Sequence, residues 1–364
     1  MGAGRQVEGM TDVRELKGAA LGAGIVAAYM ALVLASGRVD PGMFGRLLVF
    51  YLGTSFALWT FVLGFALLVM MVRAGRKTGK EPFLLRFIVT TVQQRWHRDR
   101  FVSLLWPPVL FASLLASFNS FKQMVLPIAG FTWDPMLAAA DKALFLGVDP
   151  WRVTHALFGS AEATAFIDRS YHGWFVPMSL GLIACAFMAG STFRLRTQYM
   201  LSYIGVWIGI GSIAAFLMPS AGPCFYESFV GQHASFNELL QRLAWAQSES
   251  GSTMTSLNNQ AMLLRLHGAD KLIVGGGISA MPSVHNGLAI LFALAAFRLH
   301  RGIGWFVASY AALIWIGSIH LGWHYALDGL IAFAMTFALW IACGRIAAVL
   351  DRDEPAPRPL AATA

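Results

Sequence analysis

The sequence predicts an all-helical protein that crosses a membrane several times. Of its 364 residues, 57% are hydrophobic and only 13% are charged, whereas a soluble domain has about 25% charged residues. The hydrophobic residues form stretches close to the roughly 20 residues that a spanning helix needs, and polar or basic segments separate them. We therefore expect an all-α, polytopic membrane protein with about eight transmembrane helices.

The eight expected spans follow one another along the chain. Their approximate bounds are 19–36, 48–72, 102–118, 174–192, 198–217, 284–298, 303–319 and 329–349. The first eighteen residues are polar, and no small-residue cleavage pattern follows the first apolar run, so we expect a retained span rather than a signal peptide. Residues 1–100 hold two spans and a basic loop, residues 101–350 a six-helix catalytic bundle, and residues 351–364 a polar tail.

The distribution of Lys and Arg predicts the orientation, because cytoplasmic loops are enriched in these residues. With the N-terminus in the cytoplasm, the basic 73–101 loop, the 298–302 turn and the C-terminal tail all lie there. The net charge of +8 then reflects topology and contact with anionic lipid, so we expect a membrane and no nucleic acid as partner. The compact chain and the lack of an ER-retention tail favour a bacterial inner membrane. The oligomeric state stays open.

Two long outer segments connect spans. Residues 119–173 contain two Asp-Pro pairs, at 134–135 and 149–150, which favour turns and helix starts. We expect short interfacial helices there, with Trp133 and Trp151 as anchors in the membrane interface. Residues 218–281 begin with a Pro-Ser-Ala-Gly-Pro-Cys-Phe-Tyr turn (219–226) and close with Gly-Gly-Gly (275–277). Whether residues 231–275 form a lid or a disordered connector stays open.

The first motif that carries chemistry is Ser-Ala-Met-Pro-Ser-Val-His-Asn-Gly, residues 279–287. Proline is favoured in the first helical turn, so Pro282 predicts a helix start. The free N–H groups of such a start bind anions. We expect Pro282, Ser283 and Val284 to bind a phosphate there, and His285 to give or take a proton.

The second motif is Ser-Ile-His-Leu-Gly-Trp-His-Tyr-Ala-Leu-Asp-Gly, residues 318–329. His324 and Asp328 are four residues apart and share a helix face. A carboxylate bonded to one imidazole nitrogen leaves the other nitrogen nucleophilic, which suits a histidine that attacks phosphorus. Because the two spans between the motifs form a hairpin, His285 and His324 are expected on one membrane face, outside. His320 and Tyr226 are further candidates for the pocket.

These motifs resemble those of the type 2 phosphatidic acid phosphatase superfamily. Ser-Ala-Met-Pro-Ser-Val-His, His-Tyr-Ala-Leu-Asp, the Gly-Pro-Cys-Phe-Tyr turn and residues 141–150 are most similar to the branch of the inositol phosphorylceramide synthases, over roughly 119–340. The resemblance implies that His324 is the nucleophile, that Asp328 orients it, and that His285 protonates the leaving group.

The sequence departs from the family pattern in its cations. The lipid phosphatases carry Lys-x6-Arg-Pro, yet here the only Arg-Pro is Arg358–Pro359 in the tail, and Ser318 stands where an arginine precedes the final histidine. A site with fewer arginines favours a singly charged phosphodiester over a phosphomonoester. Arg265 and Lys271 of the outer loop are candidates for the replacement charge.

The sequence therefore predicts a phosphotransferase that moves a phospho-head-group from a phospholipid donor to a lipid alcohol such as ceramide or diacylglycerol, through a phosphohistidine. No metal-ligand spacing involves Cys185, Cys224 or Cys343, and no carboxylate cluster suggests a metal, so no cofactor is expected. One alternative is hydrolysis of phosphatidic acid or a polyprenyl diphosphate at the same histidines. The other is a non-catalytic lipid-binding or transport protein. A vanadate-dependent oxidase fits the spans and the missing cations poorly.

Overall fold

The computed structural model describes residues 2–78, 98–187, 193–269 and 271–352, and these residues contain helices and no strand. The first helices are α1 (Gly2–Ala35), α2 (Pro41–Thr78) and α4 (Arg98–Ser120). A π-helical turn (Phe121–Val125) and a 3-10 turn (Leu126–Ala129) prolong α4. Both α1 and α2 pack against α4, and α1 also contacts α9.

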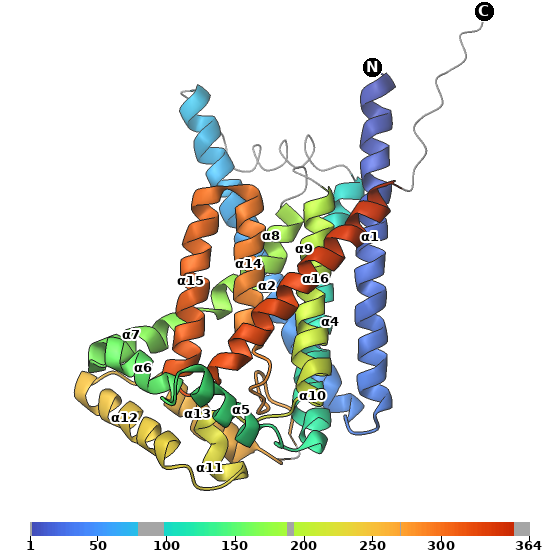
Figure 1. Ribbon diagram of the computed structural model, residues 1–364. Coiled ribbons are helices and arrows are strands. Elements are labelled where there is room, and N and C mark those ends of the chain that lie inside the picture. Colours follow the sequence, from blue (N-terminus) through green and yellow to red (C-terminus); the bar gives the residue numbers. More distant parts are fainter. Residues whose placement is uncertain (1, 79–97, 188–192, 270, 353–364) are drawn as a thin grey trace, which may run out of the picture.

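The second half supplies the rest of the bundle. It contains α8 (Phe175–Phe187), α9 (Phe193–Gly205) with its π-helical and α-helical continuations (Val206–Ala214 and Ala215–Leu217), α14 (Val284–Leu299), α15 (Arg301–His320) and α16 (Ala326–Arg352). His300 joins α14 to α15, and its Nδ1 accepts a hydrogen bond from Gly302 N at 3.1 Å. The two helices form the expected hairpin (Figure 1).

The described residues of the eight expected spans lie almost entirely in helices. Six helical segments are long and apolar enough to cross a membrane: Leu16–Ala35, Pro41–Arg73, Trp106–Ala129, Phe193–Leu217, Arg301–His320 and Ala326–Asp351. The helix α14 is apolar but shorter. Residues 188–192, the last part of the expected span 174–192, lie outside the described residues. The chain is therefore an integral membrane protein with an all-α fold.

A layer of short helices covers one end of the bundle (Figure 1). It consists of α5 (Asp134–Leu144), α6 (Pro150–Leu157), α7 (Ala161–His172), α11 (Tyr226–Phe229), α12 (Ala234–Ser250) and α13 (Thr255–Leu266). Proline stands in the first turn of α5 and α6, as expected, and Ser160 caps α7 by accepting from Ala163 N at 3.1 Å. The start of α1 and the end of α16 lie at the opposite end of the molecule.

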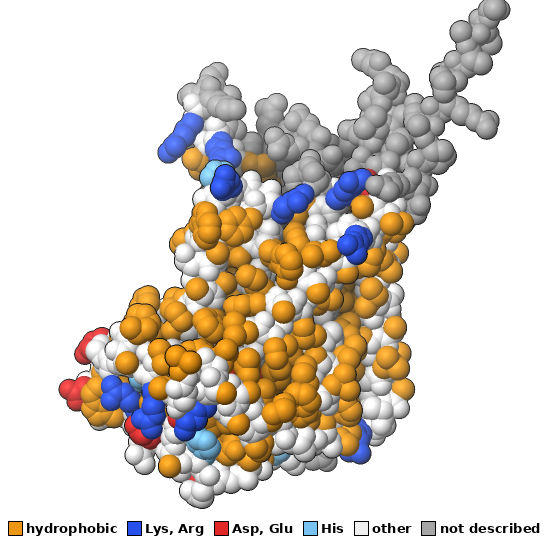
Figure 2. Space-filling view, in the orientation of Figure 1, with side chains coloured by type: hydrophobic (Ala, Val, Ile, Leu, Met, Phe, Trp, Pro, Cys, Tyr) orange, Lys and Arg blue, Asp and Glu red, His pale blue; other side chains and the backbone are white. Residues whose placement is uncertain are grey.

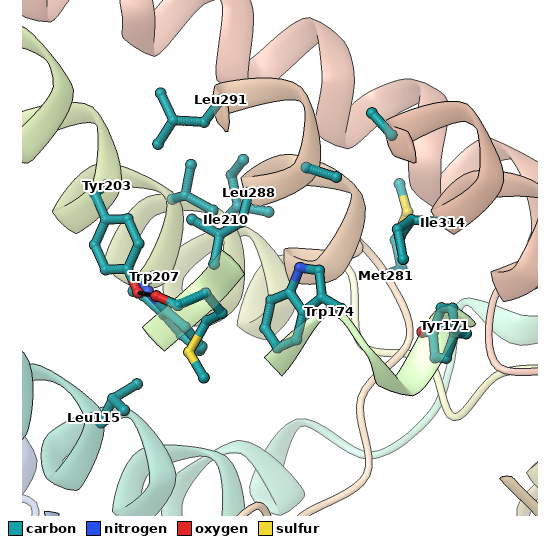
Figure 3. Close-up of a cluster of buried hydrophobic side chains, with 14 of the residues drawn as sticks. Leu115, Tyr171, Trp174, Tyr203, Trp207, Ile210, Met281, Leu288, Leu291 and Ile314 are labelled. Carbon is teal, nitrogen blue, oxygen red and sulfur yellow. Dashed lines mark hydrogen bonds between the residues drawn. The ribbon is translucent and has the colours of Figure 1, made fainter. Parts of the chain in front are cut away.

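The core lies between the helices of the second half. Figure 3 shows part of it, in which aromatic and aliphatic side chains of the α9 region meet those of α14: Tyr203, Trp207, Ile210, Leu288 and Leu291. Outside, apolar side chains cover the middle of the bundle, and charged side chains gather toward its two ends (Figure 2). Apolar side chains such as Phe61 and Phe306 are more than 70% exposed, as expected where a helix faces lipid.

One sequence prediction about the outer segments changes, and the structure bears on one alternative that the sequence left open. Trp151 is not an interfacial anchor, because it is only 4% exposed and its indole N–H donates to Ser235 Oγ at 2.9 Å. The sequence left open whether residues 231–275 are a lid or a disordered connector, and their described part forms α12 and α13. Most of the basic 73–101 loop (79–97) and most of the tail (353–364) lie outside the described residues. The division at residue 100 stays a prediction, although α1 shares a core with the later helices.

Candidate active site

The loop 321–325 between α15 and α16 carries His324 and fixes both nitrogens of its ring. Nδ1 lies 3.2 Å from Asp328 Oδ2, and Nε2 lies 3.1 Å from Ser283 Oγ. The same Asp328 oxygen accepts from Tyr325 N at 3.0 Å. Because a carboxylate only accepts hydrogen bonds, Nδ1 carries the proton and Nε2 presents its lone pair. Nε2 is therefore the nitrogen that is chemically suited to attack.

Ser283 caps α14 and contacts His324. Its Oγ accepts from Asn286 N at 3.3 Å, so its hydroxyl proton is free to bond to His324 Nε2. Ser283 is fully buried. Of the three predicted phosphate-binding residues, Pro282 and Val284 line the cavity beside the histidines, whereas Ser283 lies behind it. The Ser283 hydroxyl thus reaches His324 Nε2.

His285 lies on the first turn of α14 and faces His324. The two ring centres are 6.1 Å apart. Tyr171, at the end of α7, stacks on the His285 ring at 5.2 Å, and Trp174 packs on it at 4.1 Å; both aromatic side chains belong to the core cluster of Figure 3. The structure therefore brings together the two histidines that the motifs singled out.

Both histidines line a cavity of about 330 Å³. Its walls come from α4, the start of α8, the π-helical part after α9, α13, the glycine-rich loop and the 219–226 turn. Apolar residues supply most of the lining, including Phe118, Phe175, Trp207, Met262 and Leu263. The turn contributes Ala221 and Phe225, so it forms a wall of the pocket, and α13 forms another part of the lining.

Lys122 is the cation of this cavity. It lies on the π-helical turn that prolongs α4, and no Asp or Glu occurs among the described residues that line the cavity. The glycine-rich loop packs tightly on it, because a Cβ at Gly277 (φ +88°) would lie 2.8 Å from Lys122 O. Sequence reasoning missed Lys122, since it read residue 122 as part of an outer segment; its place directly after the third span was the available signal.

The position of the missing arginine is filled by a small buried residue. Ser318 is fully buried, its hydroxyl donates to Trp315 O at 2.7 Å, and it lies 3.3 Å from Asn286 Nδ2. Ser318 O accepts from His324 N at 3.1 Å. This position therefore holds the loop that carries His324 by hydrogen bonds and supplies no charge.

The other predicted pocket residues do not line this cavity. Arg265 and Lys271 are exposed, and Lys271 lines a separate, much smaller cavity. Tyr226 is buried, with its ring near those of His233 and Phe236. His320 is fully buried, and its Nε2 lies 3.0 Å from Thr164 Oγ1.

The His320 ring belongs to a stack of two histidine rings that lies behind the 321–325 loop. His155 of α6 lies parallel to it, with ring centres 3.7 Å apart, and His155 Nε2 donates to His320 O at 2.9 Å. Arg242 of α12 donates to His155 Nδ1 at 3.2 Å. Burial lowers the pKa of His155 to about 4, so His155 is neutral at physiological pH and its contacts are structural.

The comparison with known protein families gives one match. The model of the PAP2 superfamily, the type 2 phosphatidic acid phosphatases, matches residues 135–342, which is more than half of the chain and includes both histidine motifs. No curated protein and no solved structure matches the chain. The match supports the superfamily and does not reach the inositolphosphotransferase branch.

Proposed function

This chain belongs to the PAP2 superfamily, whose members are phosphatases or phosphotransferases that act on lipid phosphates, and on that premise we propose that it transfers a phospho-head-group between lipids. The donor is a phospholipid, and the acceptor is a lipid alcohol of the ceramide or diacylglycerol type. The observation that carries the proposal is the facing pair of His324 and His285 in a cavity whose one cation, among the described residues, is Lys122.

The proposed first step breaks the donor. His324 Nε2 attacks the phosphorus, the bond between phosphorus and the diacylglycerol oxygen breaks, and His285 gives its proton to that oxygen. Asp328 holds the Nδ1 proton, so the imidazole keeps the tautomer that attacks. The Ser283 hydroxyl is freed from Nε2 when the new bond forms, and in the proposed mechanism it then donates to a phosphoryl oxygen.

The proposed second step forms the product. The acceptor hydroxyl gives its proton to His285 and attacks phosphorus, and the P–N bond breaks with its electrons returning to Nε2. The single cation among the described lining residues, Lys122, supports a diester substrate. A diester carries one negative charge, whereas a phosphomonoester carries nearly two. The apolar side chains around the histidines suit a substrate with lipid tails.

The experiment uses the purified protein in liposomes. Labelled phosphatidylinositol or phosphatidylglycerol is supplied with and without ceramide or diacylglycerol, beside the His324→Ala and His285→Ala variants. Labelled head group on the acceptor, absent in the variants, supports the transferase. Release of free phosphate or phospho-head-group without need of an acceptor identifies a hydrolase at the same site. Unchanged turnover in both folded variants rejects the mechanism, and binding without turnover of these lipids or phosphatidic acid supports a transport or scaffold protein.

We also propose that the site faces the outside of a bacterial inner membrane. One support is that the start of α1 and the end of α16 lie at the end of the bundle opposite the layer of short helices, α5 to α7 and α11 to α13 (Figure 1). The other is the enrichment of Lys and Arg in the loops expected on the cytoplasmic side.

A further inference from the structure

The helix α5 carries two buried carboxylates that both reach the nucleophile segment. Asp134, at its first position, is fully buried. Its Oδ1 accepts from Tyr325 OH at 2.8 Å and from Gly222 N at 2.9 Å, and its Oδ2 accepts from Ala221 N at 2.8 Å. One carboxylate therefore ties the residue after His324 to the turn that forms a wall of the cavity.

Asp141 lies two turns further along α5 and holds the start of α16. Its two oxygens accept from Ala326 N at 2.6 Å and from Leu327 N at 2.9 Å. These N–H groups belong to the first turn of α16. The N–H groups of a first turn have no hydrogen-bond partners within their own helix and carry partial positive charge. The next residue is Asp328, whose carboxylate binds His324 Nδ1. A second carboxylate thus stands behind the histidine and its orienting aspartate.

We propose that α5 is a positioning helix for the nucleophile, and that the Asp141 carboxylate, acting through the start of α16, stabilises the positive charge that His324 gains when it is bonded to phosphorus. This inference rests on the proposed role of His324. Phosphorylation at Nε2 with a proton kept on Nδ1 gives the ring a positive charge, and a nearby buried anion favours that state. Asp141 touches no substrate, so it is a positioning residue.

The charges around Asp141 make its effect depend on pH. Burial first, and then the neighbouring carboxylates Asp328 of α16 and Asp149 before α6, raise the pKa of Asp141 to about 7, against the two N–H bonds that lower it. His324 and Tyr325 line the same small cavity as Asp141 and Asp149, and Arg152 lies 3.8 Å from Asp149. Asp141 is therefore charged above neutral pH and loses its charge below it.

The test is the pH dependence of turnover of a phosphodiester, phosphatidylinositol with ceramide in liposomes, because the phosphate of a diester does not titrate near neutral pH. We expect the rate of the unaltered protein to fall below about pH 7. In Asp141→Asn, we expect a roughly tenfold lower rate at pH 8. The acid limb, the fall of the rate on the acidic side of the pH profile, should move to lower pH by about one unit or more, because the group that titrates near pH 7 is gone. A lower rate with an unmoved acid limb would mean a merely structural role and overturn the proposal.

Asp168 offers a matched control. Its carboxylate accepts from Thr255 N at 2.8 Å and Ser256 N at 2.9 Å, which repeats the Asp141 arrangement at the start of α13. Asp168→Asn should lower stability in the same way and keep the acid limb of the unaltered protein. An equal displacement of the limb in both variants would count against a specific role of Asp141.

Two more variants keep the inference separate from its premise. If His324→Ala retains turnover, the proposed function fails, whatever Asp141→Asn does. If Asp141→Asn does not fold, Asp149→Asn removes a neighbouring negative charge without touching the start of α16. The acid limb should then move to lower pH, because Asp141 ionises more easily, and an unmoved limb would again overturn the proposal.

Discussion

At the scale of single residues, the two histidines are held by different means. His324 is fixed by hydrogen bonds on both ring nitrogens, to Asp328 and Ser283. His285 instead lies against the rings of Tyr171 and Trp174, which orient an imidazole without consuming its nitrogens. A nucleophile needs a fixed tautomer, and a group that alternately gives and takes a proton needs free nitrogens. The two environments match the two proposed roles.

Lys122 is the residue on which phosphate binding should depend most. We expect Lys122→Met to lower kcat/KM by roughly 10- to 100-fold, mainly through KM, because it removes the positive charge from a cavity without carboxylates among the described lining residues. Lys122→Arg should recover part of the loss. The measurement is the KM and kcat of the labelled donor for each variant.

Lys271→Met tests the alternative that Lys271, and not Lys122, supplies the positive charge for the phosphate. Lys271 was a sequence-based candidate for the replacement charge, yet it is exposed and lies outside the catalytic cavity. Its variant should change KM less than twofold. A large loss of kcat/KM in Lys271→Met, together with an unchanged kcat/KM in Lys122→Met, would show that the phosphate binds at Lys271 and not at Lys122.

His155 should make the stability of the protein depend on acid. Its folded pKa, about 4 because of burial, lies below the unfolded value of about 6.5. The stability from the neutral stack is therefore present above pH 6.5 and is lost as the pH falls toward 4, by at most about 3 kcal/mol. His155→Phe keeps a ring for stacking on His320 and removes the titration.

The measurement is the thermal unfolding midpoint in detergent between pH 4 and pH 8. His155→Phe should be somewhat less stable at pH 8, because the bond to His320 O is lost, and its midpoint should fall less steeply toward pH 4. Parallel curves for the two proteins would show that His155 does not carry this dependence.

At the scale of elements, the glycine-rich loop should position Lys122. Gly277→Ala places a Cβ 2.8 Å from Lys122 O and 2.9 Å from its Cγ, whereas at Gly275 a Cβ meets nothing within 4 Å. Both glycines have positive φ, +88° and +71°, so alanine costs backbone strain of about 1 kcal/mol at either position.

Gly275→Ala is thus the matched control for strain alone. We expect Gly277→Ala to lower donor kcat/KM at least tenfold beyond Gly275→Ala, with a higher KM, because the lysine is displaced. Kinetics with the labelled donor, beside unfolding midpoints, separate the two effects. Equal losses in the two variants would show that strain, and not the position of Lys122, explains the change.

The elements that sequence reasoning predicted well are those with a strong local signal. Apolar stretches predicted the helices of the bundle, and the Asp-Pro pairs predicted the starts of α5 and α6. Trp151 was read wrongly because an amphipathic ring has the same local pattern whether it lies at a membrane interface or inside the protein. Its partner Ser235 belongs to a distant segment, and that contact has no sequence signal.

At the scale of the whole molecule, the same limit explains the site. His285 and His324 could be placed together because the hairpin of α14 and α15 follows from counting spans. Lys122 and the carboxylates of α5 reach the site only through packing between segments about 160 to 190 residues apart in the sequence. A lone lysine or aspartate carries no motif, so the sequence could not single them out.

The arrangement of the bundle leads to a last prediction, about which side of the membrane holds the site. If the outer helices face away from the cytoplasm, a cysteine at Glu249 of α12 should react with a membrane-impermeant maleimide on intact cells. A cysteine at Arg301, in the turn between α14 and α15, should react only after permeabilisation. Both positions are exposed. Because α12 and the turn that joins α14 to α15 lie toward opposite ends of the bundle (Figure 1), each position serves as the control of the other.

The labelling is done in a background without Cys185, Cys224 and Cys343, and turnover of each single-cysteine protein verifies its fold. The Lys and Arg bias that predicts this orientation is a rule about short loops near the membrane, and the turn 298–302 with its two arginines is such a loop. The reverse pattern, with Arg301→Cys labelled on intact cells, would place the histidines in the cytoplasm. The lipid donor would then have to come from the inner leaflet, while the chemistry at His324 would be unchanged.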